Sequence, residues 1–174
     1  AITNTAVTKI VKSDTIFWCG SRNGLFRIGE SFATTQMIPE FRGLIVYDLF
    51  VLPHGNVAVA TSNGFFVGGT SGWKRYGARE GITDLVINTT CFDSSRKELW
   101  VGTNNGVYRV SPNGRVNEVT SFRNIRCNDI EIDRNNRIWL ATSNGLYTTG
   151  EQGFVLFDKV FGMQSGIRKM AYDD

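Results

Sequence analysis

The chain has 174 residues, of which 41% are apolar and 20% are charged, and these values fit one globular domain with a sizeable core and exclude a disordered chain. A net charge of +3 is too small to favour a nucleic-acid-binding protein, which needs a concentrated basic surface. The sequence holds no apolar run of about 18 residues, so we expect no membrane contact by this segment.

The predicted elements are β-strands that recur along the chain. The first are a strand at residues 5–11 and a hairpin at 16–28, and similar hairpins follow at 57–69, 99–110 and 138–150. Each hairpin carries most or all of the phrase W-x-[GA]-[ST]-x-N-G-[LFV]-[FY]. Asn-Gly is the pair best able to hold positive φ at both centres of a type I′ turn. We therefore expect Asn-Gly at the centre of each hairpin turn.

The hairpins recur at a nearly constant interval. Asn-Gly occurs at Asn23-Gly24, Asn63-Gly64, Asn105-Gly106 and Asn144-Gly145. Each hairpin has an apolar segment before it and a short strand after it, which makes four strands in about 40 residues, the pattern of a propeller blade. The sequence therefore predicts an all-β protein, a β-propeller with four visible blades and the first strand of a fifth. The predicted blades are residues 2–41, 42–81, 82–122 and 123–162, and residues 163–174 begin a further blade.

Two positions of the repeat are expected to pack between blades. Trp18, Trp100 and Trp139 occupy the first of them, where the second blade has Ala58. Two residues later each repeat has a glycine or an alanine. Because neighbouring sheets crowd together toward the propeller axis, a small residue beside a large one lets them interdigitate. We therefore interpret the tryptophans as core residues and not as a ligand platform.

A polar pair recurs ahead of two hairpins and supplies the candidate binding residues. Arg42 and Asp48 in the second blade align with Arg123 and Asp129 in the fourth. The first strands of blades line the central channel, and ligands gather at its mouth. These four residues either form a polar channel mouth or bridge adjoining blades. Two aromatic candidates, which either stack on sugar rings or pack within the sheets, are Tyr47 and Trp73.

Residues that carry catalytic chemistry are few. The single histidine, His54, lies in a predicted turn, and the sequence has no nucleophile motif and no phosphate-binding loop. Cys19, Cys91 and Cys127 are widely spaced and are expected to be structural thiols, so we predict no metal site and no cofactor. The sequence favours a protein that is not an enzyme, with a propeller lyase or hydrolase as a minor alternative.

The phrases LWVGTNNGVYRV and IWLATSNGLY, each preceded by an Asp-ended strand and a polar turn, resemble the two-component regulator propeller repeat. The resemblance covers residues 5–174. That repeat builds sensor domains of bacterial hybrid two-component systems and related surface proteins. The resemblance implies a periplasmic or extracellular, non-catalytic domain associated with carbohydrate sensing. It carries over no ligand-binding residue, because the shared motif is the structural hairpin.

Two functions stay open. The first is a binding module that recognises a saccharide or a small anionic ligand at the channel mouth, as part of a bacterial signalling or surface protein. The second is a scaffold whose blades dock protein partners or other copies of the chain. Ring closure is open as well: the chain is part of a longer protein, or copies assemble as arcs of one ring, or four blades close with residues 163–174 appended.

Overall fold

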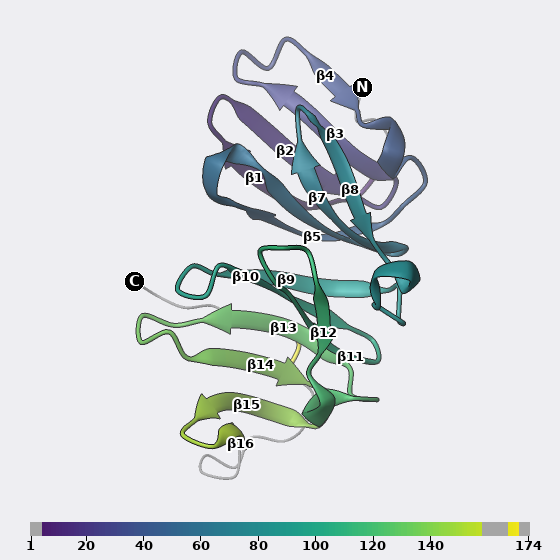
Figure 1. Ribbon diagram of the computed structural model, residues 1–174. Coiled ribbons are helices and arrows are strands. Elements are labelled where there is room, and N and C mark those ends of the chain that lie inside the picture. Colours follow the sequence, from purple (N-terminus) through teal and green to yellow (C-terminus); the bar gives the residue numbers. More distant parts are fainter. Residues whose placement is uncertain (1–4, 158–166, 171–174) are drawn as a thin grey trace.

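The fold is all-β. The computed structural model describes residues 5–157 and 167–170, and in this part of the chain 16 strands form four antiparallel sheets of four strands each. Within each sheet the strands lie side by side in chain order, and Figure 1 shows the sheets following one another from purple to yellow-green. The predicted all-β class is confirmed, and four sheets fit the predicted count of four blades.

The strands have the following bounds. The first sheet contains β1 (Val7–Ser13), β2 (Ile16–Ser21), β3 (Gly24–Gly29) and β4 (Thr35–Met37). The second contains β5 (Val46–Val51), β6 (Val57–Thr61), β7 (Gly64–Gly69) and β8 (Gly72–Tyr76). The third contains β9 (Ile87–Asp93), β10 (Glu98–Thr103), β11 (Gly106–Val110) and β12 (Val116–Glu118). The fourth contains β13 (Cys127–Ile132), β14 (Ile138–Thr142), β15 (Gly145–Gly150) and β16 (Gly153–Leu156).

Single 3₁₀ turns complete the described elements: η1 (Pro39–Phe41), η2 (Pro53–Gly55), η3 (Ala78–Glu80) and η4 (Thr120–Phe122). In the described ranges there is no helix long and apolar enough to cross a membrane. Most of the predicted start of a further blade, residues 163–166 and 171–174, lies outside the described residues.

The hairpin turns differ from the prediction by one residue. Thr103 pairs with Gly106, which places Asn104 and Asn105 at the two central positions, and Gly106 begins the next strand with a φ of 151°. The asparagine of each pair has no positive φ in any of the four described hairpins, so the predicted type I′ turn centred on Asn-Gly is wrong.

The hydroxyl of Thr103 explains the shift. It accepts a hydrogen bond from the Asn105 amide at 3.0 Å and donates one to the Gly106 carbonyl at 3.0 Å, which closes the turn one residue earlier. The residues that make the same pair of bonds in the other hairpins are Ser21, Thr61 and Thr142. The Ser or Thr of the repeated phrase therefore defines the turn.

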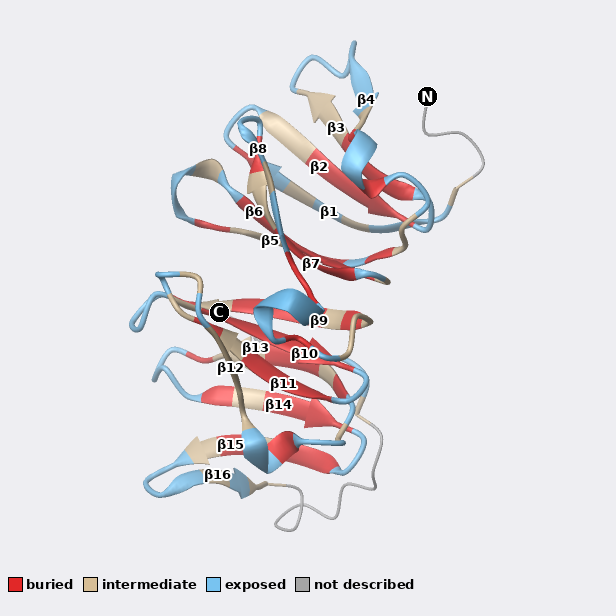
Figure 2. Cartoon of the chain, turned by 45° about the vertical axis from the view of Figure 1, so that its right-hand side comes forward, coloured by how far each residue is buried: buried red, intermediate tan, exposed pale blue. Residues whose placement is uncertain are grey.

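The core is divided among the interfaces between consecutive sheets. The first strands of the sheets are the innermost ones, with β1 contacting β5, β5 contacting β9 and β9 contacting β13. One apolar cluster fills each interface, and their buried phenylalanines include Phe41, Phe65 and Phe122. Figure 2 shows buried residues on inner and middle strands such as β2, β7 and β10, and only exposed or half-buried residues on the outermost strands β4 and β16. Each interface buries apolar surface that the isolated sheet would expose to water.

The expected packing between blades is confirmed for two of the tryptophans. Trp18 and Trp100 are almost completely buried in the first and third interfaces. Trp139 is half-buried, its indole N–H donates to Asp133 at 3.0 Å, and its ring lies edge-on to Phe157. The position therefore holds core tryptophans in two sheets and a partly exposed one in the fourth.

The small residue of the repeat is required by close approach of the sheets. A Cβ atom on Gly20 would lie 2.6 Å from Val46 Cγ1, which belongs to the next sheet. A Cβ atom on Gly102 would lie 2.7 Å from Thr89 Cγ2 and 2.8 Å from Cys127 Sγ. Carbon atoms normally stay about 3.5 Å or more apart, so at these two positions glycine sets the spacing between sheets.

Candidate functional site

An open cavity of about 860 Å³ lies where the innermost strands begin. All four innermost strands contribute to its wall, together with residues 168–169 and two hairpin residues, Asn104 and Ser143. It therefore opens at the end of the sheets that carries the hairpins between second and third strands. Cavities of this size hold small organic ligands.

A β-bulge in each innermost strand directs one side chain to the cavity. The pairing between first and second strands shifts register once per sheet, and the extra residues are Thr8, Tyr47, Asn88 and Asn128. A bulge re-aims the side chain of the unpaired residue and bends its strand. All four bulge residues line the cavity, as does Arg168, which follows Asn128 by one repeat.

Three of the bulge side chains also donate a hydrogen bond to a backbone carbonyl about one repeat later in the chain. Thr8 Oγ1 donates to the Val46 carbonyl at 2.7 Å, and Asn88 Nδ2 donates to the Cys127 carbonyl at 2.9 Å. Asn128 Nδ2 repeats the contact with the Ile167 carbonyl at 2.9 Å. Tyr47 also lines the cavity but differs from these three residues, because it makes no such bond to the described part of the chain and is 39% exposed.

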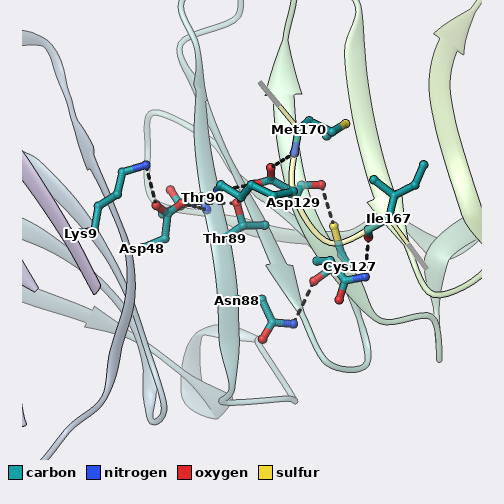
Figure 3. Close-up of polar contacts among 11 residues, drawn as sticks. Lys9, Asp48, Asn88, Thr89, Thr90, Cys127, Asp129, Ile167 and Met170 are labelled. Carbon is teal, nitrogen blue, oxygen red and sulfur yellow. Dashed lines mark hydrogen bonds and ion pairs between the residues drawn. The ribbon is translucent and has the colours of Figure 1, made fainter. Parts of the chain in front are cut away.

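A polar row follows the bulges, one residue further along each innermost strand. It contains Lys9, Asp48, Thr89, Asp129 and Lys169. Thr89 Oγ1 lies 3.3 Å from Asp48 Oδ2 and 3.1 Å from Asp129 Oδ1, as Figure 3 shows. A hydroxyl has one proton, so it donates to one carboxylate at a time. The row therefore places two buried carboxylates against a single shared donor.

The lysines at the two ends of the row neutralise these carboxylates. Lys9 Nζ lies 3.4 Å from Asp48 Oδ1, and Lys169 Nζ donates to Asp129 Oδ1 at 2.9 Å. Backbone amides add two bonds, from Thr90 to Asp48 and from Met170 to Asp129. Partial burial lowers the pKa of Lys169, but its bond to Asp129 and the nearby carboxylates outweigh that effect and raise the pKa. Lys169 is therefore charged at neutral pH.

Positive charge predominates in the wall of the cavity. The charged lining residues are Lys9, Asp48, Arg126, Arg168 and Lys169. The lysines are paired with aspartates, whereas Arg126 and Arg168 form no side-chain hydrogen bond or ion pair with the part of the chain that the structure describes. The asparagines, Ser143 and Tyr47 add neutral donors and acceptors. Such a wall suits a hydroxylated or negatively charged ligand.

A second, smaller cavity of about 130 Å³ lies further along the same strands. Glu131 lines it, and burial together with the charge of Asp129 raises the pKa of Glu131. Cys91 also lines it, and burial raises the pKa of its thiol to about 12. A thiol with such a pKa stays protonated at neutral pH and is a poor nucleophile.

The predicted site residues separate into two groups. Asp48 and Tyr47 line the large cavity, and Asp129 lies directly beside it in the polar row. Asp48 and Asp129 also join adjoining sheets through the Thr89 hydroxyl.

The other three candidates lie elsewhere. Arg42 and Arg123 directly follow η1 and η4 in exposed connections before the innermost strands, and Arg123 forms an ion pair with Glu118. Trp73 on β8 packs edge-on against Trp18 and Phe41. None of these three is among the residues that line the cavity.

Sequence reasoning named Tyr47 and Asp48 as site residues and missed the rest of the cavity wall, namely Thr8, Lys9, Val86, Asn88, Asn104, Arg126, Asn128, Ser143, Arg168 and Lys169. Alignment of the repeats places Thr8, Tyr47, Asn88, Asn128 and Arg168 at one position, which is polar or aromatic in all five copies. The next position, that of the polar row, is polar in all five copies as well, so two such residues follow one another where a regular strand would alternate. That departure from alternation was the available signal for a bulge.

No family model and no curated protein matches the sequence. Solved structures match its fold. The extracellular domain of BT4673 from B. thetaiotaomicron, described as part of a hybrid two component system, matches with a TM-score of 0.75 and 20% identity over 87% of this chain and 22% of that chain. The corresponding domain of BT3049 from B. thetaiotaomicron gives a TM-score of 0.73 and 19% identity, over 87% of this chain and 23% of that chain.

Selenomethionine-substituted virginiamycin B lyase from Staphylococcus aureus matches with a TM-score of 0.68 and 17% identity, over 90% of this chain and 56% of that chain. The four sheets have the arrangement of propeller blades. The chain spans less than a quarter of the two B. thetaiotaomicron domains and about half of the lyase. At these identities the matches show the propeller-like fold alone.

Proposed function

We propose that the chain is a non-catalytic ligand-binding domain of a bacterial signalling or surface protein, located outside the cytoplasm, and that it binds a saccharide or a small anionic ligand in the large cavity. The observation that carries this proposal is the row of bulges. Each innermost strand has one bulge residue that does not pair with the second strand, and that residue lines the cavity. Structural neighbours that are extracellular domains of hybrid two component systems support the signalling context.

The cavity wall favours binding over catalysis. Its polar side chains are mostly amides, hydroxyls, arginines and lysines, and Asp48, the one lining carboxylate among the described residues, is paired with Lys9. A general acid–base mechanism needs a group that exchanges protons near neutral pH. His54, which suits that role best, lies exposed in η2, at the far end of β5 from the cavity. A lyase or hydrolase activity therefore remains the minor alternative.

Thermal denaturation with a ligand panel tests the proposal. A panel of neutral saccharides, acidic saccharides and small anions is added to the chain, and binding to the folded state alone raises Tm. We expect at least one saccharide or anion to raise Tm in a concentration-dependent way. Arg126→Ala should then weaken binding of an acidic ligand about tenfold or more, because a charge-assisted hydrogen bond is lost.

Arg42→Ala is the matched control, since Arg42 is also an exposed arginine but lies away from the cavity. It should leave the Tm shift and the Kd unchanged. A panel that shifts nothing, or an equal loss of binding in Arg42→Ala and Arg126→Ala, would contradict the assignment of this cavity.

A further inference from the structure

The outer face of β1 is exposed at positions that are buried in every other sheet. Val7 and Ile10 are 48% and 55% exposed. The residues that align with Val7 are Val46, Ile87 and Cys127, each 0% exposed. The residues that align with Ile10 are Leu49, Thr90 and Ile130, at 2%, 3% and 2%. In the second, third and fourth sheets these positions face the preceding sheet, so β1 has the surface of a strand whose neighbour is absent.

Residues 167–170 occupy the complementary place at the other end of the row. Ile167 accepts a hydrogen bond from Asn128, and Met170 N donates to Asp129 Oδ2 at 2.7 Å. Each of these contacts has a counterpart between two sheets of the chain. Asn88 of the third sheet donates to the Cys127 carbonyl of the fourth, and the Thr90 amide of the third sheet donates to Asp48 of the second. Residues 167–170 therefore lie against β13 in the register of an innermost strand.

The two segments have the same residue pattern in this register: an apolar residue, a polar residue, a lysine and an apolar residue. Val7-Thr8-Lys9-Ile10 aligns with Ile167-Arg168-Lys169-Met170, with lysine at the third position of both. Lys9 pairs with Asp48 of the sheet that follows it, and Lys169 pairs with Asp129 of the sheet that precedes it. A strand with the sequence of β1 therefore has the carbonyl, the lysine and the amide with which residues 167–170 contact β13.

We propose that the chain self-associates head to tail, with β1 of one copy replacing residues 167–170 against β13 of a second copy. In this arrangement the Val7 carbonyl accepts from Asn128 of the second copy, and the Ile10 amide donates to Asp129 of the second copy. Lys9 then lies between two carboxylates, its own Asp48 and Asp129 of the second copy. The side chains of Val7 and Ile10 become buried, as their counterparts are at the three interfaces within the chain.

The geometry sets the size of the assembly. A head-to-tail interface uses two different surfaces, so copies form a closed ring or an open filament. Each copy supplies four sheets, and propellers typically contain four to eight blades, so two copies close a ring within the usual range. We expect a dimer.

Light scattering coupled to size exclusion, across a dilution series, measures the assembly. The wild-type chain should elute with the mass of two copies and dissociate on dilution. Ile10→Lys should raise the dimerisation Kd about tenfold or more, because association would bury an unpaired charge. Ser94→Lys adds the same charge at an exposed turn of the third sheet and should leave the Kd unchanged. Far-UV circular dichroism checks that each variant is folded.

Competition between the two segments gives a second readout. Lys169→Glu places a second negative charge beside Asp129, which weakens the binding of residues 167–170 to β13 of the same chain. The proposal therefore expects a higher dimer fraction for Lys169→Glu than for wild type. A wild-type chain that is monomeric at all concentrations would overturn the proposal and leave a further sheet of the same polypeptide, or a different protein, as the cover of β1. Equal Kd values for wild type and Ile10→Lys would overturn it as well.

Discussion

At the scale of single residues, two adjacent threonines on β9 have opposite hydrogen-bonding situations. The Thr89 hydroxyl lies between Asp48 and Asp129, whereas the Thr90 hydroxyl is buried with no partner among the described residues. Replacing a bonded hydroxyl costs stability, and replacing an orphaned one by an apolar group of the same shape is neutral or favourable. Comparing the two threonines therefore separates the contribution of the hydrogen bonds in the polar row to the free energy of unfolding from the contribution of burial alone.

Thr89→Val should lower the free energy of unfolding by about 1–3 kcal/mol, because it leaves two buried carboxylates without their shared donor. Thr90→Val keeps the backbone bond to Asp48 and should be neutral or stabilising. Urea denaturation at neutral pH measures both. If the two variants lost equal stability, the hydroxyl of Thr89 would have no special role in joining the sheets.

At the scale of the repeated element, the hairpin was predictable and its turn was not. Sequence periodicity predicted the four hairpins and the two core tryptophans, Trp18 and Trp100, because apolar alternation and the Asn-Gly pair report on local pairing. The turn centre depends on a Thr or Ser hydroxyl that captures a nearby amide, as Thr103 does with Asn105. That competition between side chain and backbone is settled by geometry, which a residue pattern does not contain.

The candidate site was predicted in part for a related reason. Asp48, Asp129 and Tyr47 stood out because they recur or are aromatic, and all three lie in or beside the cavity. Arg42 and Arg123 recur equally well, but their strands begin four residues later, at Val46 and Cys127. Register relative to a bulge decides which side chains reach the cavity, and a one-residue shift moves a side chain to the other face.

The small residue of the element gives a direct test of sheet spacing. Gly102→Ala should destabilise the protein by about 1–3 kcal/mol, because the new methyl group overlaps Thr89 and Cys127. Ala141 holds the same place in the fourth sheet and already accommodates a methyl group, so Ala141→Gly should cost less than about 1 kcal/mol. Chemical denaturation provides the comparison. A Gly102→Ala variant as stable as wild type would show that the sheets can move apart freely.

At the scale of the whole molecule, the sheets form a row in which the core lies between neighbours. The second and third sheets have an apolar interface on both faces, whereas the first has one such interface and exposes Val7 and Ile10 on its other face. In arrays of this kind stability is close to a sum of nearest-neighbour terms. The row should therefore open from its ends.

Native-state hydrogen exchange should reveal this order. At a concentration below the dimerisation Kd, amides of β2 and β3 should exchange faster than the equivalent amides of β10 and β11. Ile10→Lys provides the reference, because it disfavours association without touching the interior interfaces. Equal protection of the two hairpins would instead indicate that the whole row unfolds as one cooperative unit.

The bulges assign packing between sheets and contact with the cavity to different residues of the same strand. In the second, third and fourth sheets the residue before each bulge is completely buried. The bulge residue itself does not pair in the ladder, and it differs among the four sheets: threonine, tyrosine and asparagine. Tyr47 is also free of the bond to the next carbonyl that Thr8, Asn88 and Asn128 make. Position 47 is therefore the place at which selection, or a designed library, could alter recognition while leaving the scaffold intact.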